Sequence, residues 1–200
     1  MSNESDHLHA ELEILWGRDR LMRSQIIYET IDLESAVERI ITFHFCPATE
    51  KQDLFVSLMF ENGQISLKQK IGMLRKLLRL CYPELHTAFL FLPKHLDKLR
   101  ELRNDFAHLR LDLPAEPGST DLDAEAVKLR KLKDGQQTIR EVTRKEVDTI
   151  VRQCRDLTIA AMFLGMAVQR AARGEQEEEF TQMIVALGQQ IGKRLKDAAG

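Results

Sequence analysis

The sequence has few cysteines, almost no net charge and no long apolar run. Its three cysteines, Cys46, Cys81 and Cys154, show no CxxC spacing, which argues against a zinc motif and against a disulfide framework. All three fall on apolar helical stripes, so we expect buried free thiols in a reducing compartment. No cluster of histidine, cysteine and carboxylate residues has metal-ligand spacing, so we expect neither a metal nor another cofactor.

The charge balance and the apolar segments limit the partners. The formal net charge is −2, so no overall positive field recruits nucleic acid, and phosphate binding must rest on a local patch. The longest nearly apolar run, Leu157 to Val168, is too short to span a bilayer. The N-terminus is polar and acidic and lacks the apolar core of a signal peptide. We therefore expect a cytoplasmic protein without a membrane partner.

Apolar residues recur at helical spacing along most of the chain and predict a mainly α protein. Capping-box pairs mark the starts of several helices, as at Ser66 with Gln69 and at Thr143 with Glu146. The first predicted segments are a long helix over about 8–45, a short helix from Thr49, with Gln52 as its capping partner, to about 62, a helix over 67–81, a short helix from 83 and a helix from about 93.

The helix expected over 67–81 has a basic outer face, formed by Lys68, Lys70, Arg75, Lys76 and Arg79. Such a face suits phosphate groups or an anionic membrane surface. It also suits the solvent-exposed side of a core helix, and we favour this second interpretation.

A β-hairpin is expected to interrupt the helices. A proline-rich loop from 111 to 120 precedes two strand-like segments, 127–133 and 136–142. Between them, Asp134-Gly135 favours a tight two-residue turn. The lysines and arginines of these strands suit an exposed sheet edge as well as a ligand.

Two helices complete the chain. The first runs from Thr143 to about 173–174 and has two apolar sides, which predicts a central helix or a helix that also packs against a second subunit. The last has a single apolar stripe. The sequence thus predicts a mainly α, antiparallel up-and-down helical bundle over 1–174, with a small β-hairpin insertion near 126–142. An extra C-terminal helix over 175–200 would pack on the bundle or on a dimer partner.

The most informative stretch is the segment 99–108, LRELRNDFAH. Arg103 falls on the apolar face of its helix, where a guanidinium is costly unless it meets an anion or a hydrogen-bond partner. His108 follows five residues later, just before the helical pattern ends. These two residues are the best candidates for a functional site.

Arg103 and Asn104 followed by His108, on a leucine-rich helix of a bundle, resemble the motif of the HEPN superfamily (higher eukaryotes and prokaryotes nucleotide-binding domain). The segment from Leu67 to Leu78 and the approach from Leu96 to Leu102 are also similar to that family. The resemblance implies a HEPN-like bundle, a homodimer and RNA as substrate.

The resemblance, which covers roughly 15–173, further implies a metal-independent endoribonuclease. His108 would exchange a proton with the ribose 2′-hydroxyl or the leaving oxygen, since an imidazole changes its charge near neutral pH. Arg103 would stabilise charge on the scissile phosphate, and Asn104 would orient the phosphate or His108. Five residues on an ideal helix turn two side chains about 140° apart. A helix break near Ala107, the length of the arginine or a second copy across a dimer cleft would bring them together, and the family uses the dimer.

Other interpretations fit the same residues. The same spacing recurs at Arg39 and His44, which we interpret as chance, with His44 a hydrogen-bonded helix histidine. Toxin-type members carry a tyrosine two places after the histidine, where this chain has Arg110. Many members do not cleave RNA and serve as interaction modules. In such a module Arg103 and His108 would hold the helix end against loop carbonyls and carboxylates. The candidate carboxylates are Asp32, Asp97 and Glu101.

A regulatory function is the second class of hypothesis. A long first helix, a basic segment and a leucine-rich helix ending near a histidine resemble the layout of the mannitol operon repressor family. This resemblance implies a non-catalytic module that acts through regulatory protein partners. No helix-turn-helix recognition helix stands out, so sequence-specific DNA reading is not supported.

Overall fold

The computed structural model describes residues 2–61, 63–113, 125–133, 136–175 and 177–197. It is mainly helical with one small antiparallel sheet, which confirms the predicted mainly α bundle with a β insertion. The helical elements are α1 (Ser2–Phe45), η1 (Thr49–Lys51), α2 (Gln52–Val56), η2 (Ser57–Glu61), α3 (Leu67–Cys81), α4 (Pro83–Ala88), α5 (Phe91–His108), α6 (Arg144–Ala172) and α7 (Glu178–Asp197). The strands are β1 (Arg110–Leu111), β2 (Ala126–Lys133) and β3 (Gln136–Thr143).

The chain forms two compact units, and each is built from two separate stretches of sequence. The first unit is formed within 1–29 and 102–152, and the second within 30–101 and 153–200. Helices α1, α5 and α6 each contribute residues to both units. None of the helices in the described part of the chain is long and apolar enough to cross a membrane.

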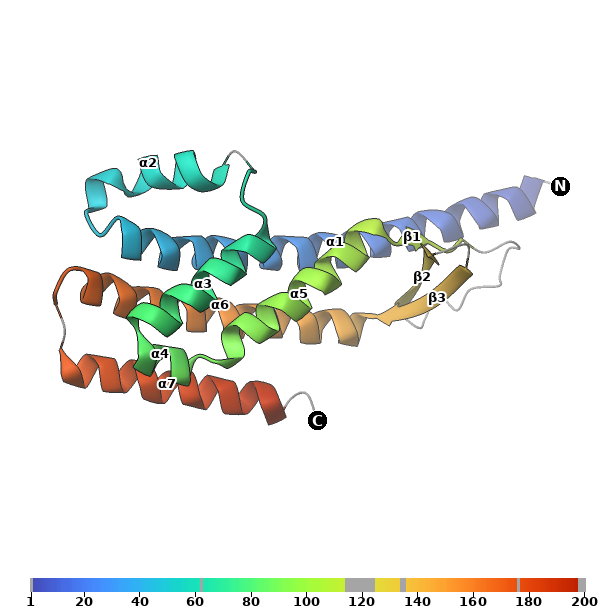
Figure 1. The fold of residues 1–200 in the computed structure, drawn as a ribbon. Coiled ribbons are helices and arrows are strands. Elements are labelled where there is room, and N and C mark those ends of the chain that lie inside the picture. The colour runs from blue at the N-terminus through green and yellow to red at the C-terminus, as the bar shows by residue number, and fades with distance from the viewer. Residues whose placement is uncertain (1, 62, 114–124, 134–135, 176, 198–200) are drawn as a thin grey trace. The chain divides into compact units, whose positions relative to one another are not determined.

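The first unit contains the sheet, in the strand order β1-β2-β3 (Figure 1). Lys133 pairs with Gln136, so two residues connect β2 to β3, which confirms the predicted hairpin. The turn residues 134–135 themselves lie outside the described residues. Strand β1 is not anticipated by the sequence, which predicts a loop from residue 111 onward. Two residues are too few to give an alternating pattern.

One face of this sheet is buried, because successive strand residues point to opposite faces. Val127, Leu129 and Val142 are fully covered, whereas Lys128 and Glu141 on the other face are exposed, and Ala126 at the start of β2 is buried as well. Other buried residues of the first unit are Leu15, Met22, Ile26, Phe106, Leu109 and Val147. The sheet therefore closes an apolar core to which α1, the end of α5 and the start of α6 contribute.

The second unit is a helical bundle in which glycines let helices approach closely. A Cβ atom added at Gly188 of α7 would lie 2.7 Å from the Phe89 ring, and one at Gly192 would lie 2.7 Å from the Phe91 ring. Helix α7 thus packs against the junction of α4 and α5, and Figure 1 shows α7 running beside α4. In the same unit, Gly165 of α6 faces Phe43 of α1.

The three predicted capping boxes differ in outcome. At Ser66 both reciprocal hydrogen bonds with Gln69 are present, as predicted. At Thr143 the hydroxyl accepts from the backbone N–H of Glu146 at 3.2 Å, while the Glu146 carboxylate pairs with Arg140 instead. The prediction at Thr49 is wrong, because no side chain caps this helix start.

Two expectations about burial are wrong, and a third is met in one of its two forms. Cys81 is exposed and Cys46 is only half-buried, while Cys154 is buried as predicted. Lys70 is 4% exposed and is not part of the outer face of α3. Most of both apolar sides of α6 is filled within the chain itself, as expected of a central helix, which is one of the two predicted alternatives. Their fully covered members include Val147, Cys154, Leu157, Ala161, Leu164 and Val168.

Candidate functional site

The segment predicted to carry function forms the end of α5 in the first unit. The helix continues without a break through Ala107 to His108, and Leu109 donates its N–H to the Asp105 carbonyl at 2.8 Å. The helix break that would have turned Arg103 toward His108 is therefore absent. Strand β1 follows after one residue, which fixes the direction in which the chain leaves the helix.

Asn104 and His108 lie on one face of α5, because residues four apart on a helix are neighbours. Both side chains are exposed. His108 has no hydrogen-bond or ion-pair partner among the described residues, so its imidazole is open to solvent. The structural hypothesis has His108 hold the helix end against loop carbonyls, and because residues 114–124 of that loop lie outside the described residues, it stays a prediction.

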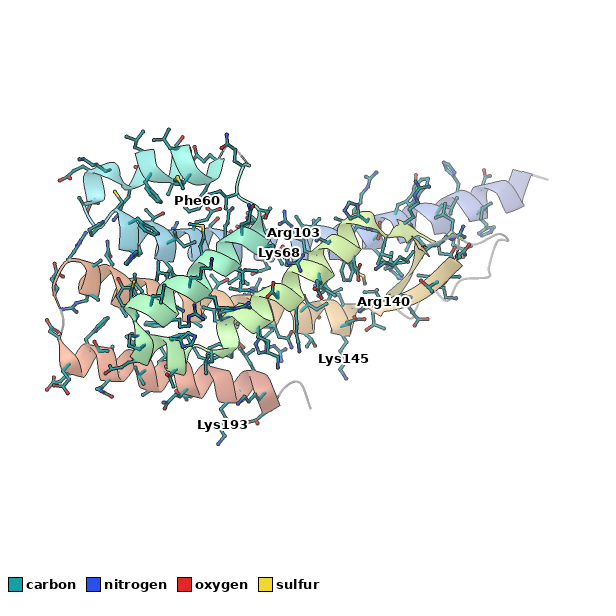
Figure 2. All side chains as sticks on the ribbon, viewed as in Figure 1. Phe60, Lys68, Arg103, Arg140, Lys145 and Lys193 are labelled. Atoms are coloured by element: carbon teal, nitrogen blue, oxygen red, sulfur yellow. The ribbon has the colours of Figure 1, made fainter. Side chains whose placement is uncertain are left out.

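Arg103 is separated from this pair. On the unbroken helix its side chain leaves the axis about 140° away from that of His108. Arg103 is half-buried and is already engaged in an interaction within the protein. Figure 2 shows its place on α5. One copy of the chain thus brings Asn104 and His108 together and leaves Arg103 outside the pair.

Two of the candidate structural carboxylates have other partners. Asp97 accepts from Arg75 at 3.0 Å and lies 3.6 Å from Arg100, and Glu101 accepts from Arg100 at 3.1 Å. All of these residues lie in the second unit. Their carboxylates are therefore already neutralised by neighbouring arginines.

Two arginines beside His108 are missed by the sequence argument. Arg110 opens β1 and stands directly opposite Arg130 of β2. Like charges at facing strand positions repel each other. Arg130 is held by Asp112, whose carboxylate accepts from its Nε at 2.9 Å. Arg110 is exposed and has no such partner among the described residues, so it leaves one uncompensated positive charge two residues after His108.

The last turn of α5 is fixed by contacts within the first unit. Arg23 of α1 donates to the Phe106 carbonyl, and the Arg140 guanidinium lies 5.9 Å from the centre of the Phe106 ring. Lys131 of β2 pairs with Asp105. Figure 2 shows Arg140 on β3. These contacts make the end of α5 a rigid support for His108.

Two cavities of the described part of the chain do not include the candidate residues. A cavity of about 450 Å³ in the second unit lies between α4, the end of α6 and the start of α7. A cavity of about 200 Å³ in the first unit is lined by Arg18, Leu21, Met22, Glu125 and Arg144. His108 and Asn104 therefore stand on an open surface of a single copy.

The second Arg-x4-His pair has a structural role at its histidine. His44 shares a hydrogen bond of 2.8 Å with the Tyr82 hydroxyl through Nδ1, and its ring meets the rings of Phe45 and Tyr82 edge-on. This confirms that His44 is a hydrogen-bonded helix histidine. Burial lowers the pKa of His44 and raises that of Tyr82, since it disfavours the charged form of each.

Lys70 joins two glutamates of α1 in the second unit. Its ammonium donates to Glu34 at 2.6 Å and also to Glu38, and it lies 5.5 Å from the centre of the Phe60 ring. Burial alone would lower the pKa of Lys70, but the hydrogen bonds and charges of both glutamates outweigh it and raise the pKa. Lys70 therefore holds α3 against α1. The basic face of α3 consists of the remaining four residues, Lys68, Arg75, Lys76 and Arg79.

No family model matches the chain, and comparisons with curated proteins and with solved structures give no match either. Among the described residues, no group of three or more His, Cys, Asp and Glu side chains is placed to hold a metal ion. A function for the α5 end therefore has to be argued from its own chemistry and geometry.

Proposed function

We propose that this chain is a HEPN-like, metal-independent endoribonuclease of the cytoplasm, with His108 as its proton-transfer residue. The observation that carries the proposal is the exposed imidazole of His108 on a rigid helix end, which has no partner among the described residues. A histidine that only stabilised the helix would have a partner in the protein. Asn104 beside it and Arg110 two residues on are suited to hold a phosphate oxygen.

The proposed reaction breaks one phosphodiester bond and needs no added reactant. The His108 imidazole takes the proton of a ribose 2′-hydroxyl, and the 2′-oxygen attacks the adjacent phosphorus. The bond from phosphorus to the 5′-oxygen breaks, that oxygen takes up a proton from water, and the proton held by His108 is released to solvent. The products are a 2′,3′-cyclic phosphate and a free 5′-hydroxyl. An arginine stabilises the extra negative charge on the phosphate oxygens while the bond to the 2′-oxygen is partly formed and the bond to the 5′-oxygen is partly broken.

A second copy is needed to supply that arginine from Arg103. In one chain Arg103 and His108 diverge by about 140° on an unbroken helix. In a two-fold dimer the motif of one copy faces that of the other, so Arg103 of one chain can approach His108 of its partner. The proposed enzyme is therefore a homodimer with two equivalent sites.

RNA cleavage in the presence of EDTA tests this function. Wild-type protein should cut single-stranded RNA and leave cyclic phosphate ends. His108→Ala should lower the rate on the order of 10²–10⁴-fold, because the proton-transfer contribution is lost. Its melting temperature should not change, since His108 is exposed and unpartnered. His9→Ala, at another exposed histidine of the first unit, is the matched control and should cleave normally. Wild-type protein that leaves diverse RNAs intact would defeat the proposal.

One observation favours a second function, that of a non-catalytic HEPN-like module acting through regulatory protein partners. Arg103 is half-buried and already engaged within the chain, as expected of a structural arginine. In that case Arg103→Ala would lower the melting temperature sharply, because its partner would be left unpaired. A functional arginine, in contrast, would leave stability nearly unchanged on substitution and would abolish cleavage. Arg103→Lys would rescue little of this cleavage, since a point charge does not replace a bidentate fork.

A further inference from the structure

Helix α1 exposes a regular apolar line within the first unit. Ile14, Leu21 and Tyr28 are 43, 52 and 64% exposed, respectively, although all three are large apolar or aromatic side chains. They stand seven residues apart, which places them along one side of the helix. Small exposed residues alternate with them at four- and three-residue steps. We call the whole line the α1 seam, and its members are His7, Ala10, Ile14, Gly17, Leu21, Ser24 and Tyr28.

Gly17 lies in the middle of the α1 seam, and no packing contact among the described residues requires a glycine there. Glycine is, after proline, the least favourable residue inside a helix, and α1 is 44 residues long. A Cβ atom added at Gly17 would meet nothing within 4 Å, so packing within the chain does not require glycine there. A glycine on a helix surface lets another backbone approach closely. Its position therefore points to a second helix lying on the α1 seam.

The sizes along the α1 seam indicate that the second helix is antiparallel. In the heptad notation of coiled coils, the a positions of the α1 seam hold large residues and the d positions hold small ones. The a positions are His7, Ile14, Leu21 and Tyr28, and the d positions are Ala10, Gly17 and Ser24. Parallel coiled coils set a against a and d against d, which would leave glycine opposite glycine. An antiparallel copy of the same seam sets every large residue against a small one. The layers would be Ile14 on Gly17, Leu21 on Ala10 and His7 on Ser24 of the second copy. Facing large and small residues fill such an interface without voids.

The charges beside the α1 seam are complementary in this register. Glu13 and Arg20 flank the seam on one side, and both are exposed and without an ion-pair partner among the described residues. Antiparallel pairing about a two-fold axis near Leu15 and Trp16 brings Glu13 of one copy to Arg20 of the other, twice. Sliding the helices by seven residues would instead set Arg20 against Arg20. Flanking charges of this kind select partner and register.

We propose that the α1 seam docks on the α1 seam of a second copy of this chain, antiparallel and in the register just given. The overlap from His7 to Ser24 is about 27 Å long at 1.5 Å per residue. This is a narrow contact for a protein interface, so the dimer should be reversible, with a dissociation constant on the order of micromolar. The α1 seam contains neither Arg103 nor His108, so this surface goes beyond the proposed function.

Analytical ultracentrifugation of the full chain across the micromolar range tests the α1 seam. Wild-type protein should be a reversible dimer. Leu21→Glu should be monomeric and keep the wild-type melting temperature, since Leu21 is exposed. Leu80→Glu, at a leucine of α3 that is 72% exposed and outside the α1 seam, is the matched control and should still dimerise. A monomeric wild type, or a Leu21→Glu variant as dimeric as the control, would overturn the proposal.

Charge exchange and disulfide trapping test the register. Glu13→Arg should weaken the dimer at least several-fold, and adding Arg20→Glu should restore it. In a background of Cys46→Ser and Cys81→Ser, the double variant Ala10→Cys with Leu21→Cys should form a disulfide-linked dimer on oxidation. Ala10→Cys alone should not. Crosslinking of this single variant would show a parallel pair and reject the proposed register.

The same variants keep this proposal apart from the nuclease proposal. A wild-type dimer that is broken by Leu21→Glu supports the α1 seam even when no RNA is cut. Cleavage by a protein that is monomeric at every concentration would reject the α1 seam and the supply of Arg103 by a second copy, and it would leave only the role of His108 standing. The two proposals therefore fail by different measurements.

Discussion

Lys70 shows how a single charged residue can belong to the core. Its side chain is 5% exposed, and the side chains of Glu34 and Glu38 that receive its ammonium are each 17% exposed. The two glutamates are four residues apart on α1, where like charges repel. The ammonium between them removes that repulsion and fixes α3 against α1. The sequence pattern could not show this, because the partners are more than thirty residues away in the chain.

Lys70→Met should lower the stability by about 3 kcal/mol, at the low end for a broken buried pair, because both glutamates stay partly exposed. The measurement is chemical denaturation monitored by circular dichroism. Adding Glu34→Gln and Glu38→Gln to Lys70→Met should recover a large part of the loss, since no unpaired charge then remains. If the triple variant is no more stable than the single one, charge pairing is not what Lys70 contributes.

His44 should make the second unit sensitive to acid. Burial lowers the pKa of His44 from its ordinary value of 6.5, so the unfolded chain binds the proton more readily than the folded one. The contribution to stability is complete above that value and is lost as the pH falls through the folded pKa. Accordingly, His44→Gln should show a smaller drop in melting temperature than wild type between about pH 7.5 and pH 5.5. Equal drops in the two proteins would mean that other groups cause the acid sensitivity.

At the scale of elements, the sequence predicts a helix cap correctly where only neighbouring residues take part, and fails where distant residues bind the same side chains. The Ser66 box needs only residues within one turn, and it forms as predicted. At Thr49 the same signature fails, because the Arg173 guanidinium donates to its hydroxyl at 3.0 Å and Gln52 donates to the Cys46 carbonyl at 3.1 Å. Arg173 lies over a hundred residues away, so no local pattern could reveal it.

The candidate site divides in the same way. The helix over 99–108 and the divergence of Arg103 from His108 follow from periodicity alone, whereas the exposure of His108 does not. Arg110 and Arg130 stand opposite each other because of the register between β1 and β2, which lie about twenty residues apart in the chain. That register is fixed only when the sheet closes on its core, so the sequence alone does not predict that Arg130 stands opposite Arg110.

Glycines at two helix positions should respond to alanine in opposite ways. Gly188→Ala forces a methyl to within 2.8 Å of two Phe89 ring atoms, so overpacking should destabilise the protein by about 1–3 kcal/mol. Gly72→Ala, in the interior of α3 with nothing within 4 Å, should stabilise it by about 0.5–1 kcal/mol. Thermal and chemical denaturation of the pair give the comparison. A stabilised Gly188→Ala variant would show that α7 does not pack on Phe89 as described.

At the scale of the whole molecule, the nuclease proposal makes a prediction about mixed dimers. Arg103→Ala and His108→Ala should each be inactive alone. Mixed and allowed to exchange, half of the dimers carry one copy of each, and one of their two sites is then intact. Cleavage should return to about a quarter of the wild-type level if each site draws its arginine and histidine from different copies. No recovery despite proven exchange would place both residues in one chain's site or in no site.

Because each unit joins two distant stretches, neither unit can fold until its second stretch has been synthesised. The first unit requires 102–152 to meet 1–29, and the second requires 153–200 to meet 30–101. At roughly 5–20 residues per second, the start of α1 leaves the ribosome on the order of ten seconds before its last partners are made. During that interval its apolar residues have nothing to pack against. A chain that stops before residue 152 therefore lacks part of both the sheet-bearing core and the helical bundle.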